Sequence, residues 1–96
     1  MWAGAAVLCL ATTPSRAQTV TTTVNVGNAP TAAAINAVSN KIYVANASDN
    51  NVTVIDGATN ATVTVNTGSN PAAVALNPVS NKIYVANHGG NTVTVI

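Results

Sequence analysis

Apolar and polar residues alternate along this chain in short runs, and each run predicts a β-strand. The run Lys41–Asn46 shows the pattern most clearly, because it is apolar on both faces of an extended strand. Ile42 and Val44 form one face, and Tyr43 and Ala45 form the other. Apolar residues on both faces predict a strand that is covered on both sides.

Three further runs with the same period lie around it, at Thr31–Asn36, Asn51–Ile55 and Ala61–Asn66. The last alternates valine with threonine, which is typical of a strand with one solvated face. Ser39-Asn40 and Asp56-Gly57 supply turn residues, and a strand spacing of about ten residues leaves no room for a crossover helix. A short helix is the alternative for the alanine-rich run, although a run of this length holds no helix without a partner face.

The same runs return 41 residues later without insertion or deletion. Lys41–Asn46 is identical to Lys82–Asn87, and residues 20–55 as a whole repeat in residues 61–96. A fixed period in this range indicates a repeat architecture, in which one supersecondary unit stacks on its copies. We also expect a strand at Val20–Val26, in phase with the fourth strand of the first repeat, which makes eight strands in all.

Four antiparallel strands in each repeat are typical of a β-propeller blade. Small residues such as Ala32–Ala34 suit a first strand near the propeller axis, and the threonine-rich fourth strand suits the solvated rim. We therefore predict an all-β fold with about two four-stranded antiparallel blades. Because propellers close with about four to eight blades, two blades are an incomplete propeller. The chain is then the N-terminal fragment of a longer propeller or, alternatively, a half-unit that assembles with copies of itself.

The segment Asn40–Asn46 followed by Asn51–Gly57 resembles the YVTN β-propeller repeat family, and so does its second copy at Asn81–Asn87 and Asn91–Ile96. Ala45 and Ala86 stand where the family name has threonine. The resemblance covers residues 20–96 and implies an exported or surface-layer protein of bacteria or archaea with about seven blades. Related propellers include lactonases and the haem or quinone domains of periplasmic oxidoreductases.

The first seventeen residues differ from the rest. Trp2–Ala11 is an apolar run of about ten residues, too short to span a bilayer. Ser15 and Ala17 have the spacing of a signal-peptidase site, so we expect cleavage after Ala17 and a mature chain from residue 18. A buried strand or helix of the folded domain is the alternative. Export then leads to the periplasm, the medium or the cell surface.

The composition excludes several classes of partner. The chain of 96 residues has only three basic and two acidic residues, so it has no field to attract nucleic acid or anionic membrane. Its hydrophobic content of 48% is too high for a disordered chain. The single cysteine, Cys9, lies in the predicted leader after Leu8, which is too large for a lipoprotein signal. We therefore expect a mature form without disulfide, lipid anchor or membrane span.

Candidate catalytic chemistry is sparse. Asp49 and Asp56 are predicted in loops at opposite ends of the blade, so they cannot act as a carboxylate pair. His88 is the only histidine and has no second ligand near it in sequence. Three glycosylation sequons begin at Asn46, Asn51 and Asn60, but in a chain this rich in Asn and Thr they are weak signals. We predict no catalytic residue, cofactor or metal in this chain.

A binding surface is the better prediction. In a propeller, the loops before the first strand and between the second and third strands share one face, which places residues 27–30, 46–51, 68–71 and 87–91 together. Within these loops the repeats differ most, with Ala47-Ser48-Asp49 against His88-Gly89-Gly90. Repeat proteins commonly vary binding loops on a constant scaffold. The predicted ligand-facing residues are Asn46, Asp49, Asn50, Asn87, His88 and Asn91.

The leading hypothesis for function is thus an exported, non-enzymatic binding or cell-surface scaffold with a protein or glycan ligand. The alternative is part of a propeller enzyme, a lactonase or a haem or quinone oxidoreductase domain, whose catalytic residues lie in other blades. We expect the remaining blades, or further copies of the chain, as structural partners.

Overall fold

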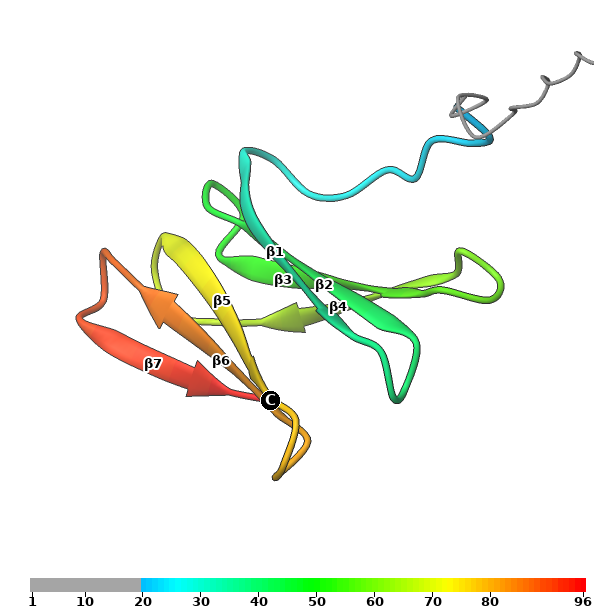
Figure 1. The fold of residues 1–96 in the computed structure, drawn as a ribbon. Helices are drawn as coiled ribbons and strands as arrows, with labels where there is room; N and C mark the ends of the chain where they lie inside the picture. Colours follow the sequence, from blue (N-terminus) through cyan, green and yellow to red (C-terminus); the bar gives the residue numbers. More distant parts are fainter. Residues whose placement is uncertain (1–19) are drawn as a thin grey trace, which may run out of the picture.

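A computed structural model describes residues 20–96 as seven strands in two antiparallel sheets (Figure 1). The first sheet contains β1 (Pro30–Asn36), β2 (Lys41–Asn46), β3 (Asn51–Asp56) and β4 (Thr62–Asn66), and the second contains β5 (Pro71–Asn77), β6 (Lys82–Asn87) and β7 (Thr92–Val95). In each sheet the strands lie side by side in chain order. The all-β prediction is confirmed, and the alanine-rich run forms a strand. The predicted leader at residues 1–17 lies outside the described residues.

The two sheets use the same strand register. Tyr43 is opposite Val54 in the first sheet, and Tyr84 is opposite Val95, 41 residues further on, in the second. Even the irregularity after the strand-opening proline recurs, between Pro30 and Ala32 and between Pro71 and Ala73. Residues 20–96 include no helix that is long and apolar enough to cross a membrane.

The predicted strand at Val20–Val26 is wrong, so residues 20–96 form seven strands and not eight. Residues 20–27 have no regular secondary structure, and Val20 is 84% exposed. Figure 1 shows this segment, in blue to cyan, running away from both sheets. The physical reason is the lack of a partner among the described residues: the segment matches β4, which is ordered by hydrogen bonding to β3 of its own sheet.

The core lies between the two sheets. Tyr43, Ala45 and Val52 of the first sheet are buried against Ile83 and Val85 of the second. The most extensive backbone contact between the sheets is between β1 and β5, with β2 also near β5. Small side chains on β1 and β5 permit this contact, because the distance between two packed sheets depends on the size of the side chains between them.

Left-handed backbone conformations mark the turns of both repeats. Six of the seven non-glycine residues with positive φ are asparagines, which adopt this region at low cost. The exception is Ala29, with φ of 55° immediately before Pro30. Its counterpart in the second repeat is Asn70, also with φ of 55°. The backbone at Ala29 is therefore strained, whereas asparagine adopts the same conformation at the equivalent position, Asn70, at low cost.

We expect Ala29→Asn to raise the free energy of unfolding by about 0.5–1 kcal/mol, because asparagine tolerates the left-handed region that the alanine Cβ disfavours. Urea unfolding followed by circular dichroism measures this. Asn70→Ala is the matched control and should lose a similar amount. A lower free energy of unfolding for Ala29→Asn than for the wild-type chain would show that the backbone at Ala29 is not strained.

Candidate functional site

Four loops lie together along one edge of the two sheets, and we call them the loop rim: residues 27–30, 46–51, 67–71 and 87–91. In the first repeat the Ala47 amide donates to the Ala29 carbonyl at 2.9 Å, and in the second the His88 amide donates to the Asn70 carbonyl at 2.9 Å. Between the repeats, the Thr67 amide donates to the Asn50 carbonyl at 3.0 Å. The structure thus brings together the loops that the sequence assigned to one face.

Asn46 and Asn87, at the ends of β2 and β6, are buried, so their side chains lie beneath the exposed tips of the loops. The Asn46 Nδ2 donates to Asn51 Oδ1 and Thr53 Oγ1, both at 2.9 Å. The Asn87 Nδ2 donates to Thr92 and Thr94 in the same way, at 3.1 and 2.8 Å. The amide of each asparagine therefore ties two strands together just below the rim.

Gly27 lies directly over the amide of Asn46. A Cβ on Gly27 would lie 2.8 Å from Asn46 Cγ and 2.8 Å from Asp49 Oδ2, so a larger residue would displace the loop. Gly68 has the same relation to Asn87, at 3.0 Å from its Cγ. The glycines at these two positions are explained by this close approach.

Asp49 is the acidic residue of the loop rim, and it joins the first two loops. Its Oδ2 accepts a hydrogen bond from the Asn28 backbone amide at 2.8 Å, and its Oδ1 accepts one from Asn28 Nδ2 at 3.0 Å. The Asn28 backbone amide, and after it the Asn28 side chain, lowers the pKa of Asp49. Asn28 was missed in the sequence analysis, because nothing local in the sequence signals a contact between two loops.

We expect the ties between Asp49 and Asn28 to weaken in acid. Because the pKa is lowered on folding, the stabilisation is present above the unfolded-state pKa and is lost as the pH falls through the lowered value. An NMR titration of the Asn28 backbone amide should show a midpoint below the ordinary aspartate range. Asp49→Asn should abolish this titration, whereas a midpoint in the ordinary range would contradict the assignment.

The exposed residues of the loop rim that the sequence predicted are Asp49, Asn50, His88 and Asn91. Asn50 also has a structural role, since its Oδ1 accepts a hydrogen bond from the Asn70 amide at 2.8 Å. Asn70 Nδ2 lies 3.4 Å from His88 Nδ1. An amide nitrogen only donates, so this contact is a hydrogen bond when Nδ1 carries no proton. Asn70 is the second rim residue that sequence reasoning missed.

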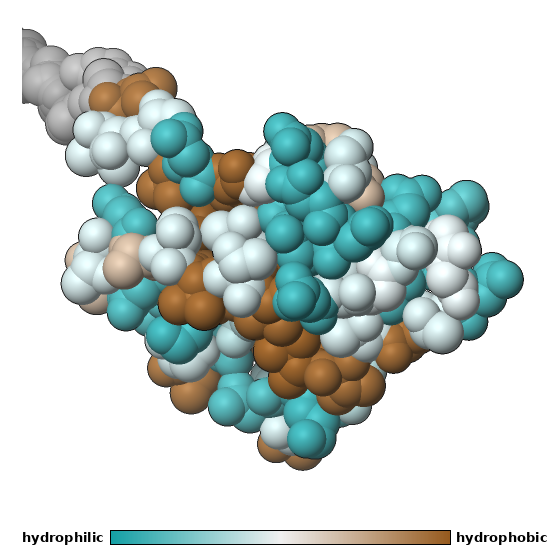
Figure 2. All heavy atoms as spheres, turned by 180° about the vertical axis from the view of Figure 1, so that it is seen from behind, coloured by the Kyte–Doolittle hydropathy of each residue, from teal (hydrophilic) through white to brown (hydrophobic). Residues whose placement is uncertain are grey.

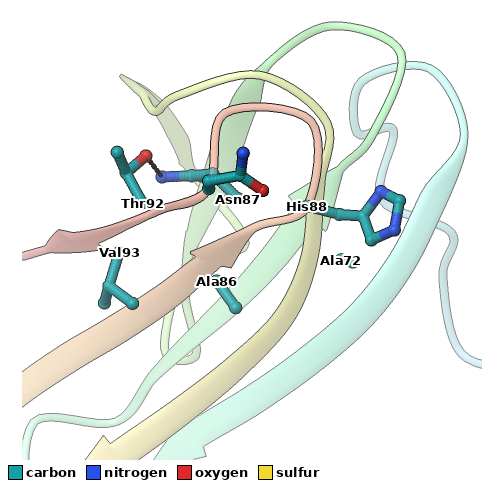
Figure 3. A pocket seen from close by; sticks show the side chains of 7 residues that line it. Ala72, Ala86, Asn87, His88, Thr92 and Val93 are labelled. Atoms are coloured by element: carbon teal, nitrogen blue, oxygen red, sulfur yellow. Dashed lines mark hydrogen bonds between the residues drawn. The ribbon is translucent and has the colours of Figure 1, made fainter.

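A hollow of about 430 Å³ opens beside the second half of the rim (Figure 3). Its wall combines apolar residues with rim residues: Ala72, Ala86, Val93, Asn87, His88, Asn91 and Thr92. Figure 3 shows the His88 ring projecting away from the hydrogen-bonded pair of Asn87 and Thr92. Such a site can accept hydrogen-bonding groups at its upper edge and apolar groups below.

The remaining candidates lie apart. Asp49 is in the loop after β2 and Asp56 ends β3, at the other end of the antiparallel pair, so the two acids lie apart as predicted. Within residues 20–96, no cluster of three or more His, Cys, Asp or Glu could hold a metal ion. Of the three sequons, Asn46 is buried and Asn51 half-buried, while Asn60 is exposed in the turn before β4.

No family model matches the chain, and no curated protein is significantly similar to it. The resemblance to the YVTN repeats therefore stays a prediction.

Proposed function

We propose that the two sheets are blades of an exported YVTN-type β-propeller, which acts as a binding or cell-surface scaffold and presents its ligand site on the loop rim. Three features support the propeller arrangement. Strands follow chain order within each sheet, successive sheets pack face to face, and the contact between the sheets is most extensive at their first strands. Small residues occupy those first strands, as a propeller axis requires.

The observation that carries the binding role is the contrast between a constant scaffold and a variable rim. Lys41–Asn46 and Lys82–Asn87 are identical, yet the three residues that follow each strand differ completely. The backbone around them is the same, with φ of 54° at Asn50 and 53° at Asn91. Variation confined to the exposed tips of otherwise equal loops is typical of a binding surface.

The chemistry of the rim favours a neutral, hydroxyl-rich ligand. Exposed asparagine side chains dominate it, namely Asn28, Asn50, Asn70 and Asn91, with Asp49 as the one acid and His88 as the one imidazole. Each amide offers both a donor and an acceptor without net charge. We therefore propose an oligosaccharide in preference to an anionic or cationic partner.

Amide chemical-shift mapping with defined neutral oligosaccharides, such as chitotetraose and maltoheptaose, tests this function. We expect saturable shifts in residues 46–51 and 87–91. Shifts confined to other surfaces, or no shift with any sugar of the panel, would count against a glycan site on the rim.

The chain offers a matched control within itself. Replacing residues 88–90 with Ala-Ser-Asp, which occupy the corresponding positions 47–49, keeps the loop length and the expected backbone conformation. If His88 and its neighbours recognise the ligand, this exchange removes binding and leaves the thermal unfolding temperature unchanged. Unchanged binding would assign recognition to the constant residues.

Export is tested separately from binding. We expect the processed chain from a bacterial periplasm or culture medium to begin at Gln18, since residues 15–17 match a signal-peptidase site. N-terminal sequencing of that material measures the cleavage point. A soluble cytoplasmic product that keeps Met1 would contradict export.

A further inference from the structure

Equivalent residues of the two repeats differ sharply in exposure on one face of their sheets. On the first sheet, Tyr43, Ala45 and Val52 are buried by the second sheet. On the second sheet, their counterparts Tyr84, Ala86 and Val93 lie on the outer face, and Val93 is 59% exposed. Both triads have the same strand register. The outer face of β5–β7 therefore has the residues of a packing face without a cover among the described residues.

The opposite faces show the reverse contrast. Ile83 and Val85 are buried against the first sheet, whereas their counterparts Ile42 and Val44 are only half-buried. Ile35 of β1 is 60% exposed, although its counterpart Leu76 is half-buried. The outer face of β1–β4 is thus the counterpart of the face that β5–β7 presents to the core. At equivalent positions, the two exposed faces therefore have residues similar to those of the two faces that pack against each other in the core.

The groups that form hydrogen bonds between the two repeats have equivalents 41 residues away that do not form these bonds. Asn50 accepts from the amides of Thr67 and Asn70, and Asn36 Nδ2 donates to Asn81 Oδ1 at 2.5 Å. The corresponding groups of the second repeat, on Asn91 and Asn77, are exposed. Their matching partners are on Ala29 and Asn40, 41 residues before Asn70 and Asn81, and both residues are also exposed.

One strand is missing from the second sheet. The first sheet ends with β4 on β3, whereas β7 has no neighbour on its other side within residues 20–96. Residues 21–25, Thr-Thr-Thr-Val-Asn, match the β4 sequence Thr-Val-Thr-Val-Asn at four of five positions but pair with no strand. An unpaired strand edge is a template for strand addition from another chain.

We propose that copies of this chain add head to tail: residues 20–26 of one copy pair with β7 of another as its fourth strand, and the β1–β4 sheet of the first copy covers the open face of β5–β7. The link from residue 26 to Pro30 has the same length as the link from Thr67 to Pro71. The interchain junction can therefore repeat the geometry of the intrachain one. Apolar surface is exposed across the middle of the molecule in Figure 2, in keeping with faces that need a cover.

This proposal rests on the proposed propeller packing and adds to it the partner, which is a second copy, the added strand and the register of that strand. A heterologous contact of this kind closes into a ring or extends into a filament. Ala86 and Val93 line both the hollow and the open face, so a docked copy would cover the apolar wall of the hollow. The oligosaccharide test measures residues 46–51 and 87–91 of the loop rim, so failure of the self-assembly test leaves it unaffected.

The register can be tested by disulfide cross-linking of the full chain in a Cys9→Ser background. In the first sheet Thr53 is opposite Thr64. The flanking backbone bonds, Asp56 to Ala61 at 2.8 Å and Thr67 to Asn50 at 3.0 Å, make this a non-hydrogen-bonded pair. Such pairs have a Cα separation that suits a disulfide. The equivalent interchain pair is Thr94 with Thr23, so Thr23→Cys with Thr94→Cys should form linked dimers and larger species under mild oxidation.

The matched control is Thr22→Cys with Thr94→Cys, because side chain 22 points to the opposite face of the added strand. We expect non-reducing electrophoresis to show at least about tenfold less cross-linking for this pair, since disulfides require a defined Cβ geometry. Equal cross-linking of both pairs, or linkage only within single chains, overturns the proposed strand addition.

A pair of proline variants tests the same contact without cysteines. The Val24 amide would bond to β7, as Val65 does to Val52, whereas the Thr23 amide would point away. Val24→Pro should therefore shift the chain towards monomer in size exclusion with light scattering, with a dissociation constant about tenfold higher or more, while Thr23→Pro leaves assembly unchanged. A wild-type chain that is monomeric throughout, or assembly that Val24→Pro does not alter, overturns the proposal.

Discussion

The variant Ala45→Asp is expected to lose the cooperative unfolding transition, while Ala86→Asp keeps it. Both alanines occupy the fifth position of the same six-residue strand, Lys-Ile-Tyr-Val-Ala-Asn. Ala45 is completely buried between the sheets, whereas Ala86 lies on the outer face of β6. Burying a carboxyl group without a partner costs about 4 kcal/mol or more, because it must be desolvated or protonated. This is a large part of the stability of any small domain.

Circular dichroism during thermal and urea unfolding measures the difference. The wild-type and Ala86→Asp chains should show sigmoidal transitions, and Ala45→Asp should show none. Dilute samples are needed, because Ala86 lies on the face that we propose for docking of a second copy. Loss of the cooperative transition in both variants would mean that the sheets do not pack as described, since the two alanines differ only in whether the other sheet packs over them.

The second large effect is expected at Ile83. Ile83→Ala should lower the free energy of unfolding by about 3 kcal/mol, because it removes a fully buried side chain and leaves a cavity between the sheets. Ile83 is 1% exposed and lies opposite Leu76 on the face that covers Tyr43 and Ala45. Few other side chains can fill the space that it leaves, since the hydrophobic core cluster of residues 20–96 contains only five buried residues.

Ile42→Ala is the matched control for this prediction. Ile42 has the same position in the first repeat but is only half-buried, so we expect a loss of about 1 kcal/mol. Urea unfolding of equally dilute samples gives both values, because a docked second copy would cover Ile42. A loss at Ile42 as large as that at Ile83 would show that the outer face of the first sheet is covered in solution.

Much of the local structure could be predicted from the sequence. The strand at Lys41–Asn46 was predicted with its observed bounds, and Asn51–Ile55 and Ala61–Asn66 each differ from the structure by one residue. These runs were readable because side-chain alternation and turn residues are local properties. Val20–Val26 has the same alternation but forms no strand, since alternation does not supply a hydrogen-bonding partner.

The candidate site was predicted in part. The sequence grouped the four loops correctly, but it did not separate Asn46 and Asn87, which are buried under the rim, from Asn50 and Asn91, which are exposed. All four lie at strand ends next to turns. Their different roles depend on which side chains lie beneath and above them, such as Thr53 under Asn46 and Gly27 over it.

The two identical strands β2 and β6 separate what the sequence by itself determined from what only the tertiary structure decided. Their six residues determined the extended conformation, the two apolar faces and the turns on either side, because these depend on neighbours along the chain. Yet Tyr43 and Ala45 are buried on β2, whereas Ile83 and Val85 are buried on β6. Equal sequences with opposite buried faces differ only in which sheet lies against them, and that contact forms between residues far apart in the chain.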